Sequence, residues 1–145
     1  MKLIAIGDLH GKDCWKQIGF NQYDKVVFMG DYTDSFTATN DEVFINLSAL
    51  IQLKKSEPAK FVLLLGNHDI QYMYFPDFPC TGFRPHAQVG LTDLFRRNTD
   101  CFDVAYQYRK YLFTHAGVSK SWHHKYEAMM RSYISNHLSM GKALN

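Results

Sequence analysis

The stretch LIAIGDLHG at residues 3–11 shows the pattern that organises the first half of the chain: a short apolar run, a glycine, then polar side chains. The same order recurs in VVFMGDYTD at residues 26–34 and in FVLLLGNHD at residues 61–69. Continuous short apolar runs are typical of strands that are buried on both faces, as in a parallel sheet. The sequence therefore predicts three such strands, each ending at a glycine.

An amphipathic helix is predicted between the second and third strands. Its apolar side chains fall at positions i, i+1, i+4, i+7 and i+8, which lie on one helix face: Val43, Phe44, Leu47, Leu50 and Ile51. Thr39 and Glu42 are spaced as a capping box at its start, and Pro58 prevents its continuation. A second helix is expected over residues 12–18. The order β-α-β-α-β predicts an α/β fold with a mostly parallel sheet flanked by helices.

The second half of the chain has a different pattern. Residues 71–86 interleave aromatic residues with proline and glycine, which predicts an irregular loop that could overhang the preceding strand end as a lid or a stacking platform. Helices are predicted near residues 89–97 and 121–138, and a hairpin from strands at 102–106 and 111–114. Because no repeat or linker is visible, we expect residues 1–145 to belong to one domain.

The composition indicates a soluble globular protein. Apolar residues make up 46% of the 145 residues, charged residues 21%, and the net charge is +2. Such a charge makes nucleic acid an unlikely partner, and no apolar run is long enough to span a membrane. The three cysteines, Cys14, Cys80 and Cys101, are scattered and odd in number, which favours reduced thiols in a cytoplasmic protein.

Candidate ligands follow each predicted strand. Asp8 and His10 come after the first strand, Asp31 and Asp34 after the second, and Asn67 and His68 after the third; a fourth strand ends in Thr114-His115-Ala116-Gly117. In open α/β sheets, ligands bind beyond the carboxyl ends of the strands, so these side chains are expected to converge. Each strand-Gly-Asp segment alone is an ordinary turn, but four such ends together indicate a metal site.

The order GDxHG, GDxxD, GNHD and HAG resembles the calcineurin-like metallophosphoesterase superfamily over about residues 3–118. The HAG element resembles the branch that contains protein Ser/Thr phosphatases and symmetrical dinucleoside-tetraphosphate hydrolases. The resemblance implies the N-terminal part of a four-layer α/β-β/α sandwich. It also implies metal-dependent hydrolysis of a phosphorylated substrate.

The resemblance also implies a role for each candidate residue. Asp8 and His10 correspond to ligands of a first metal, Asp31 to a bridge between two metals, and Asn67 and His115 to ligands of the second. His68 corresponds to the general acid and Asp34 to its orienting partner.

The chemistry of these residue types agrees with such roles. Two metal ions that flank a bridging water lower its pKa and direct a hydroxide at phosphorus. Mixed oxygen and imidazole ligands suit Mn, Fe or Zn. A histidine with a pKa near neutrality can supply a proton at physiological pH.

Two departures from the family pattern affect the expected function. The protein-phosphatase branch continues GDxxD with Arg-Gly, whereas Ser35 and Phe36 follow Asp34 here. Arg84 is a candidate replacement, since a guanidinium binds phosphate bidentately; the alternative is a solvated surface arginine.

The second departure is that no Gly-His element follows residue 118. His123, His124 and His137 lie on the last predicted helix, where we expect surface or half-buried positions. We therefore expect a domain that stops midway, a weaker second metal site, and self-association through an uncovered sheet surface. The alternatives are a nuclease or nucleotide pyrophosphatase of the same superfamily, or a binding or regulatory fragment without turnover.

Overall fold

A four-stranded parallel sheet forms the centre of the molecule. The structure is a computed structural model that describes the backbone of residues 1–135 and the side chains of residues 1–128 and Arg131. The sheet has the order β1-β2-β3-β4, with β1 at Leu3–Ile6, β2 at Lys25–Phe28, β3 at Phe61–Leu64 and β4 at Phe102–Asp103. The α/β fold with a parallel sheet, as predicted from the three apolar runs, is confirmed.

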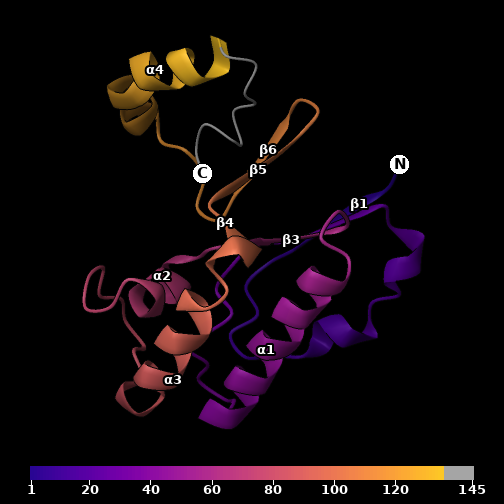
Figure 1. The fold of residues 1–145 in the computed structure, drawn as a ribbon, viewed down its shortest axis with the longest axis vertical. Helices are drawn as coiled ribbons and strands as arrows, with labels where there is room; N and C mark the ends of the chain where they lie inside the picture. Colours follow the sequence, from indigo (N-terminus) through magenta and orange to yellow (C-terminus); the bar gives the residue numbers. More distant parts are fainter. Residues whose placement is uncertain (136–145) are drawn as a thin grey trace.

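Three helices pack against one face of this sheet (Figure 1): α1 at Asn40–Ser56, α2 at Asn67–Met73 and α3 at Pro85–Arg96. The main core lies between them and the strands. The predicted inner face of α1 is correct except for Phe44, whose side chain is 40% exposed. The capping box of α1 is confirmed, because Glu42 N donates to Thr39 Oγ1 and Thr39 N donates to Glu42 Oε2.

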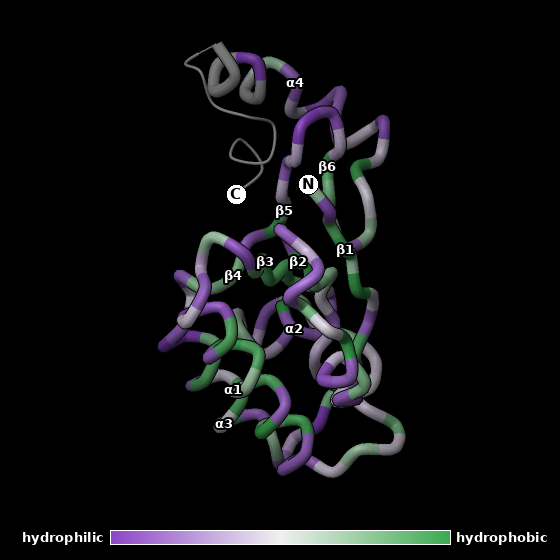
Figure 2. The backbone as a smooth tube through the Cα atoms, turned by 90° about the vertical axis from the view of Figure 1, so that its right-hand side faces the viewer, coloured by the Kyte–Doolittle hydropathy of each residue, from purple (hydrophilic) through white to green (hydrophobic). Residues whose placement is uncertain are grey.

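An antiparallel hairpin covers the other face of the sheet. It consists of β5 at Ala105–Tyr108 and β6 at Tyr111–Thr114. Tyr106 and Phe113 of the hairpin pack on the buried side chains of Val27, Val62 and Leu64. Figure 2 shows the apolar strands β2 and β3 in the middle of the molecule.

The last described helix, α4 at Lys120–Ser135, lies beyond the hairpin and away from α1, α2 and α3 (Figure 1). Its predicted end at Leu138 falls outside the described residues. No helix among the described residues has both the length and the apolar character needed to cross a membrane.

Several predicted elements were wrong in detail. The helix expected over residues 12–18 is a short 3-10 turn at Cys14–Gln17, followed by another at Phe20–Gln22. Trp15 fixes the first turn to α1 by donating its indole N–H to Asn46 Oδ1 (2.8 Å). Strand β1 is half-buried rather than buried on both faces, because it forms an edge of the sheet.

The predicted loop and hairpin boundaries also changed. The expected loop at 71–86 is shorter, since α2 extends to Met73 and α3 begins at Pro85, which leaves residues 74–84 as the loop. The strand expected over 102–106 divides at Val104 into β4, which pairs with β3, and β5, which pairs with β6.

Candidate metal centre

The loops after β1, β2 and β3 meet at the carboxyl edge of the sheet, as predicted. Three candidate residues in these loops have left-handed backbone conformations: His10 at φ 46°, Asp31 at 54° and Asp34 at 56°. Residues other than glycine seldom adopt this conformation, and such strain gathers at functional sites.

Two glycines allow the β2 and β3 loops to touch. A Cβ atom on Gly66 would lie 2.0 Å from Asp31 Oδ1, and one on Gly30 would lie 2.5 Å from the Gly66 nitrogen. Side chains at either position would separate the loops. The glycines of these two motifs are therefore a steric requirement of the site.

Asp69, the last residue of the GNHD segment, holds the same two loops together. Its buried carboxylate accepts hydrogen bonds from the backbone N–H groups of Asp31 (2.7 Å), Tyr32 (2.9 Å) and Gly66 (2.9 Å). Burial raises the pKa of Asp69 to about 7, against the opposing effect of these donors. The sequence patterns gave Asp69 no role. Its contact with Gly66 is a local one at the start of α2, but its contacts with Asp31 and Tyr32 form only in the fold.

Asp31 lies at the centre of the candidate ligands. Its Oδ2 atom is 3.8 Å from His10 Nε2 and 3.4 Å from His115 Nε2, and its Oδ1 accepts from the backbone N–H of His68 (3.0 Å). Within residues 1–135, ligand atoms of Asp8, Asp31 and His115 form one metal-competent group in which all lie within 4.8 Å of one another. His10 borders this group at Asp31.

Both candidate histidine ligands are oriented by backbone carbonyls. His10 Nδ1 lies 2.9 Å from Thr33 O, and His115 Nδ1 lies 2.8 Å from Met29 O, so each Nε2 is directed at Asp31. Such contacts fix which ring nitrogen faces a metal. His115 Nε2 also lies 3.1 Å from Asn67 Oδ1.

The proximity of Asp31 and His115 shifts the pKa of both. Hydrogen bonding to Asp31, opposed by burial, raises the pKa of His115 to about 9. Burial raises the pKa of Asp31, but hydrogen bonds from His115 and His68 outweigh it and leave the pKa below its usual value. Both shifts show that a cation is favoured beside the Asp31 carboxylate.

His68 and Asp34 form a second pair at the edge of this cluster. His68 Nδ1 is 2.9 Å from Asp34 Oδ2, and the His68 ring centroid is 5.1 Å from that of His10. Asp34 is 1% exposed, and burial raises its pKa. The structure thus brings together the predicted pair and all five predicted ligands; their roles remain predictions.

The Arg84 guanidinium lies close enough to Asp34 to oppose the rise of its pKa on burial, but its hydrogen bonds go to other groups. The guanidinium donates to Asn40 Oδ1 (2.8 Å) and to the carbonyls of Ala38 (2.8 Å) and Ser35. The side chain is half-buried, which contradicts the alternative of a solvated surface arginine. These contacts favour a structural role, and the predicted phosphate contact gains no support from them.

Residues 80–82 of the loop after α2 border the site. Cys80 Sγ accepts from Asn67 Nδ2 (2.9 Å) and lies 3.7 Å from His68 Nε2, while a Cβ on Gly82 would lie 3.8 Å from His68 Cε1. Most of the loop's aromatic rings pack on one another, including Phe75 on Phe83 with centroids 5.7 Å apart. Residues 80–82 thus overhang the end of β3, as expected, while a role of the loop as lid or stacking platform remains a prediction.

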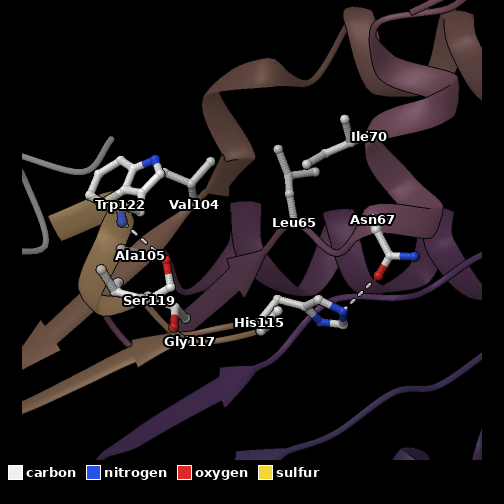
Figure 3. A pocket seen from close by; sticks show the side chains of 12 residues that line it. Leu65, Asn67, Ile70, Val104, Ala105, His115, Gly117, Ser119 and Trp122 are labelled. Carbon is white, nitrogen blue, oxygen red and sulfur yellow. Dashed lines mark hydrogen bonds between the residues drawn. The ribbon is translucent and has the colours of Figure 1, made fainter. Parts of the chain in front are cut away.

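An apolar cavity of about 440 Å³ opens beside Asn67 and His115. Figure 3 shows Leu65, Ile70, Val104 and Trp122 around it, with the His115 ring directed at Asn67. Further along α4, His123 and His124 are exposed, as expected, and His137 falls outside the described residues.

The fold and the cluster define an α/β protein with a candidate metal centre built on the carboxyl edge of a parallel sheet. Residues 1–139 match the calcineurin-like phosphoesterase family, and the chain belongs to that family. A search of curated proteins and a search of solved structures each found no match. Family membership implies metal-dependent hydrolysis of phosphate esters.

Proposed function

We propose that the chain hydrolyses phosphate esters with two divalent transition-metal ions, and that His68 donates a proton to the leaving-group oxygen. One arrangement carries this proposal: Asp31 lies between His10 and His115, and the His68–Asp34 pair borders the same cluster.

The donor set fits such ions. Ligand atoms about 2.0–2.2 Å from one ion lie roughly 3–3.5 Å from one another, close to the separation of Asp31 Oδ2 and His115 Nε2, 3.4 Å. Carboxylate oxygen, amide oxygen and imidazole nitrogen suit Mn, Fe or Zn. When bound, the ions supply positive charge for the phosphoryl oxygens and activate water as the nucleophile.

The protein's own groups position the proton donor. Asp34 pairs with His68 Nδ1, which leaves Nε2 as the nitrogen that can carry a proton to the substrate. Asp31 accepts from the backbone N–H of His68, so the proposed acid and the proposed bridging ligand are fixed to each other.

We favour small phosphate esters over phosphoproteins as substrates. The Thr114–Gly117 element supports the branch of protein Ser/Thr phosphatases and symmetrical dinucleoside-tetraphosphate hydrolases. However, Ser35 and Phe36 replace the Arg-Gly of the phosphoprotein enzymes, and the guanidinium of Arg84 is engaged elsewhere.

The test is turnover of 4-nitrophenyl phosphate by metal-stripped protein after addition of Mn²⁺, Fe²⁺ or Zn²⁺. Asp31→Asn is expected to reduce kcat/KM at least about a thousandfold, because it removes charge from the shared ligand. Asp93→Asn, at a surface aspartate that pairs with Arg97, is the matched control and should retain full activity. Absence of turnover with every metal would instead support a binding or regulatory role.

A further inference from the structure

The Asp34 carboxylate has two hydrogen-bond donors besides His68. Gln71 Nε2 donates to Asp34 Oδ2, the atom that also contacts His68, and the Tyr72 hydroxyl donates to Asp34 Oδ1. Both donors come from α2, and both side chains are buried, with 2% exposure for Gln71 and 0% for Tyr72. Each carboxylate oxygen therefore has a buried donor supplied by α2.

The same two side chains bind the loop at residues 74–84. Gln71 Oε1 accepts from the backbone N–H of Cys80 (2.9 Å), and the Tyr72 hydroxyl accepts from the backbone N–H of Arg84 (2.8 Å). Phe83 stacks on the Tyr72 ring with centroids 5.3 Å apart. Each side chain thus contacts Asp34 on one side and the loop on the other.

We propose that Gln71 and Tyr72 are positioning residues that hold Asp34 in line with His68 and connect this pair to the loop at 74–84. The inference rests on the proposed function, in which His68 is the proton donor. It adds that α2 sets the orientation of the acid through Asp34.

A carboxylate held by His68 alone would be free to turn about its Cβ–Cγ bond. The Tyr72 hydroxyl donates to Oδ1, and without this donor the buried oxygen must seek another one by rotating away from His68. Burial and the Asp34 carboxylate raise the pKa of Tyr72, so the phenol stays protonated and keeps its proton for Asp34. Loss of the partners that orient a metal ligand commonly costs 10- to 100-fold in affinity or activity, and we expect a similar factor for the partners that orient this acid.

A packing role alone predicts a different result from a positioning role. General-acid catalysis matters most when the leaving group is a poor one. A variant that misplaces His68 should therefore lose more rate on phenyl phosphate than on 4-nitrophenyl phosphate. A variant that merely loosens the core should lose the same factor on both.

The experiment compares Tyr72→Phe with Tyr32→Phe in the Mn²⁺-loaded protein. Tyr32 is an equally buried tyrosine, but its hydroxyl donates to the Leu64 carbonyl (2.7 Å) rather than to Asp34. Tyr72→Phe is expected to reduce kcat on phenyl phosphate about 10- to 100-fold, with a loss at least about five times smaller on 4-nitrophenyl phosphate. Tyr32→Phe should leave the ratio of the two rates unchanged.

A double-mutant cycle with His68→Asn completes the test, because two residues that act through one group are not additive. In the His68→Asn background, Tyr72→Phe should no longer change the rate ratio. Equal losses on both substrates, or a full additional effect without His68, overturns the inference. Gln71→Met, which keeps the side-chain volume and removes the donor, gives a second variant if Tyr72→Phe unfolds.

The hydrogen bond between Asp34 and His68 can also be measured directly by NMR, without an activity assay. The His68 Nδ1 proton, held by Asp34, should give a downfield proton NMR signal in wild type and in Tyr32→Phe that is lost in Tyr72→Phe. If wild type shows no turnover, the proposed function fails while this signal still decides the positioning role. If the His68 Nδ1 proton signal is still present in Tyr72→Phe, the positioning role is contradicted, whether or not the protein is active.

Discussion

At the scale of single residues, His115 combines two properties that affect metal binding. Its Nε2 faces Asp31, and hydrogen bonding to that carboxylate raises the pKa of His115 to about 9. A metal ion binds only neutral imidazole, so the ion must displace this proton. Below pH 9 the proton competes with the metal, and the competition weakens as the pH rises.

We therefore predict that Mn²⁺ binding at pH 7.5 releases about one proton from His115, and that affinity increases from pH 7 to pH 9. Calorimetry in buffers of different ionisation enthalpy measures the released proton. His115→Gln should abolish it, whereas His124→Gln, at an exposed histidine of α4, should not. Binding without proton release at pH 7.5 would show that His115 is already neutral or is not a ligand.

Asp69 is the second residue whose role follows from its contacts. Asp69→Asn replaces one accepting oxygen with an NH₂ group that faces backbone donors from Asp31, Tyr32 and Gly66. We expect a loss of about 2–3 kcal/mol in the unfolding free energy of the metal-free protein, measured by urea denaturation. Because the β2 and β3 loops then separate, Mn²⁺ affinity should fall as well. Asp93→Asn is the control, and equal midpoints for the two variants would contradict this role.

The sequence predicted the candidate ligands better than the residues that hold them. Asp8 and Asp31 follow strands of the parallel sheet, whose carboxyl ends converge whatever the details of packing. His115 instead follows β6 of the antiparallel hairpin, so its place beside Asp31 depends on how the hairpin packs on the sheet. The contacts of Gln71, Tyr72 and Asp69 depend on how α2 sits against the β2 loop. No short sequence pattern encodes that packing.

At the scale of elements, the strands were predictable because their apolar runs are continuous. Helix α1 was predictable because its capping box and the helical spacing of its apolar side chains indicate the same helix. The segment at 12–18 lacks both a cap and a strong period, and it forms only a 3-10 turn anchored by Trp15. Residues 102–106 were predicted as one strand, but only Phe102 and Asp103 pair with β3, and the chain passes to the hairpin at Val104.

The β5–β6 hairpin provides a prediction at this scale. Phe113 packs on the cluster of Val27, Val62 and Leu64, while Leu112 on the opposite side of β6 is 38% exposed. Phe113→Asp should lower the unfolding free energy by about 2–4 kcal/mol, because it uncovers apolar surface and places a charge beside it. Leu112→Asp should cost less than about 1 kcal/mol. Similar urea midpoints for the two variants would show that the hairpin does not protect the sheet.

At the scale of the whole molecule, the two proposed metal sites differ in their protein ligands. Asp31, Asn67 and His115 form the proposed second site, and only two of them carry strong donors, since the Asn67 amide is neutral. We predict two unequal Mn²⁺ binding steps in calorimetry, with dissociation constants that differ by at least about tenfold. Asn67→Ala should remove the weaker step and spare the tighter one. Two equally tight steps would contradict the assignment of ligands.

Asp8 and His115 are far apart in the sequence, yet their ligand atoms belong to one compact group with Asp31. Two ions held there and joined through Asp31 would act as a cross-link that closes residues 8–115 into a loop. Such closure lowers the entropy of the unfolded chain most when the loop is long. The bound ions would thus stabilise the folded state as well as take part in the reaction. Chelation should therefore lower the melting temperature together with the activity.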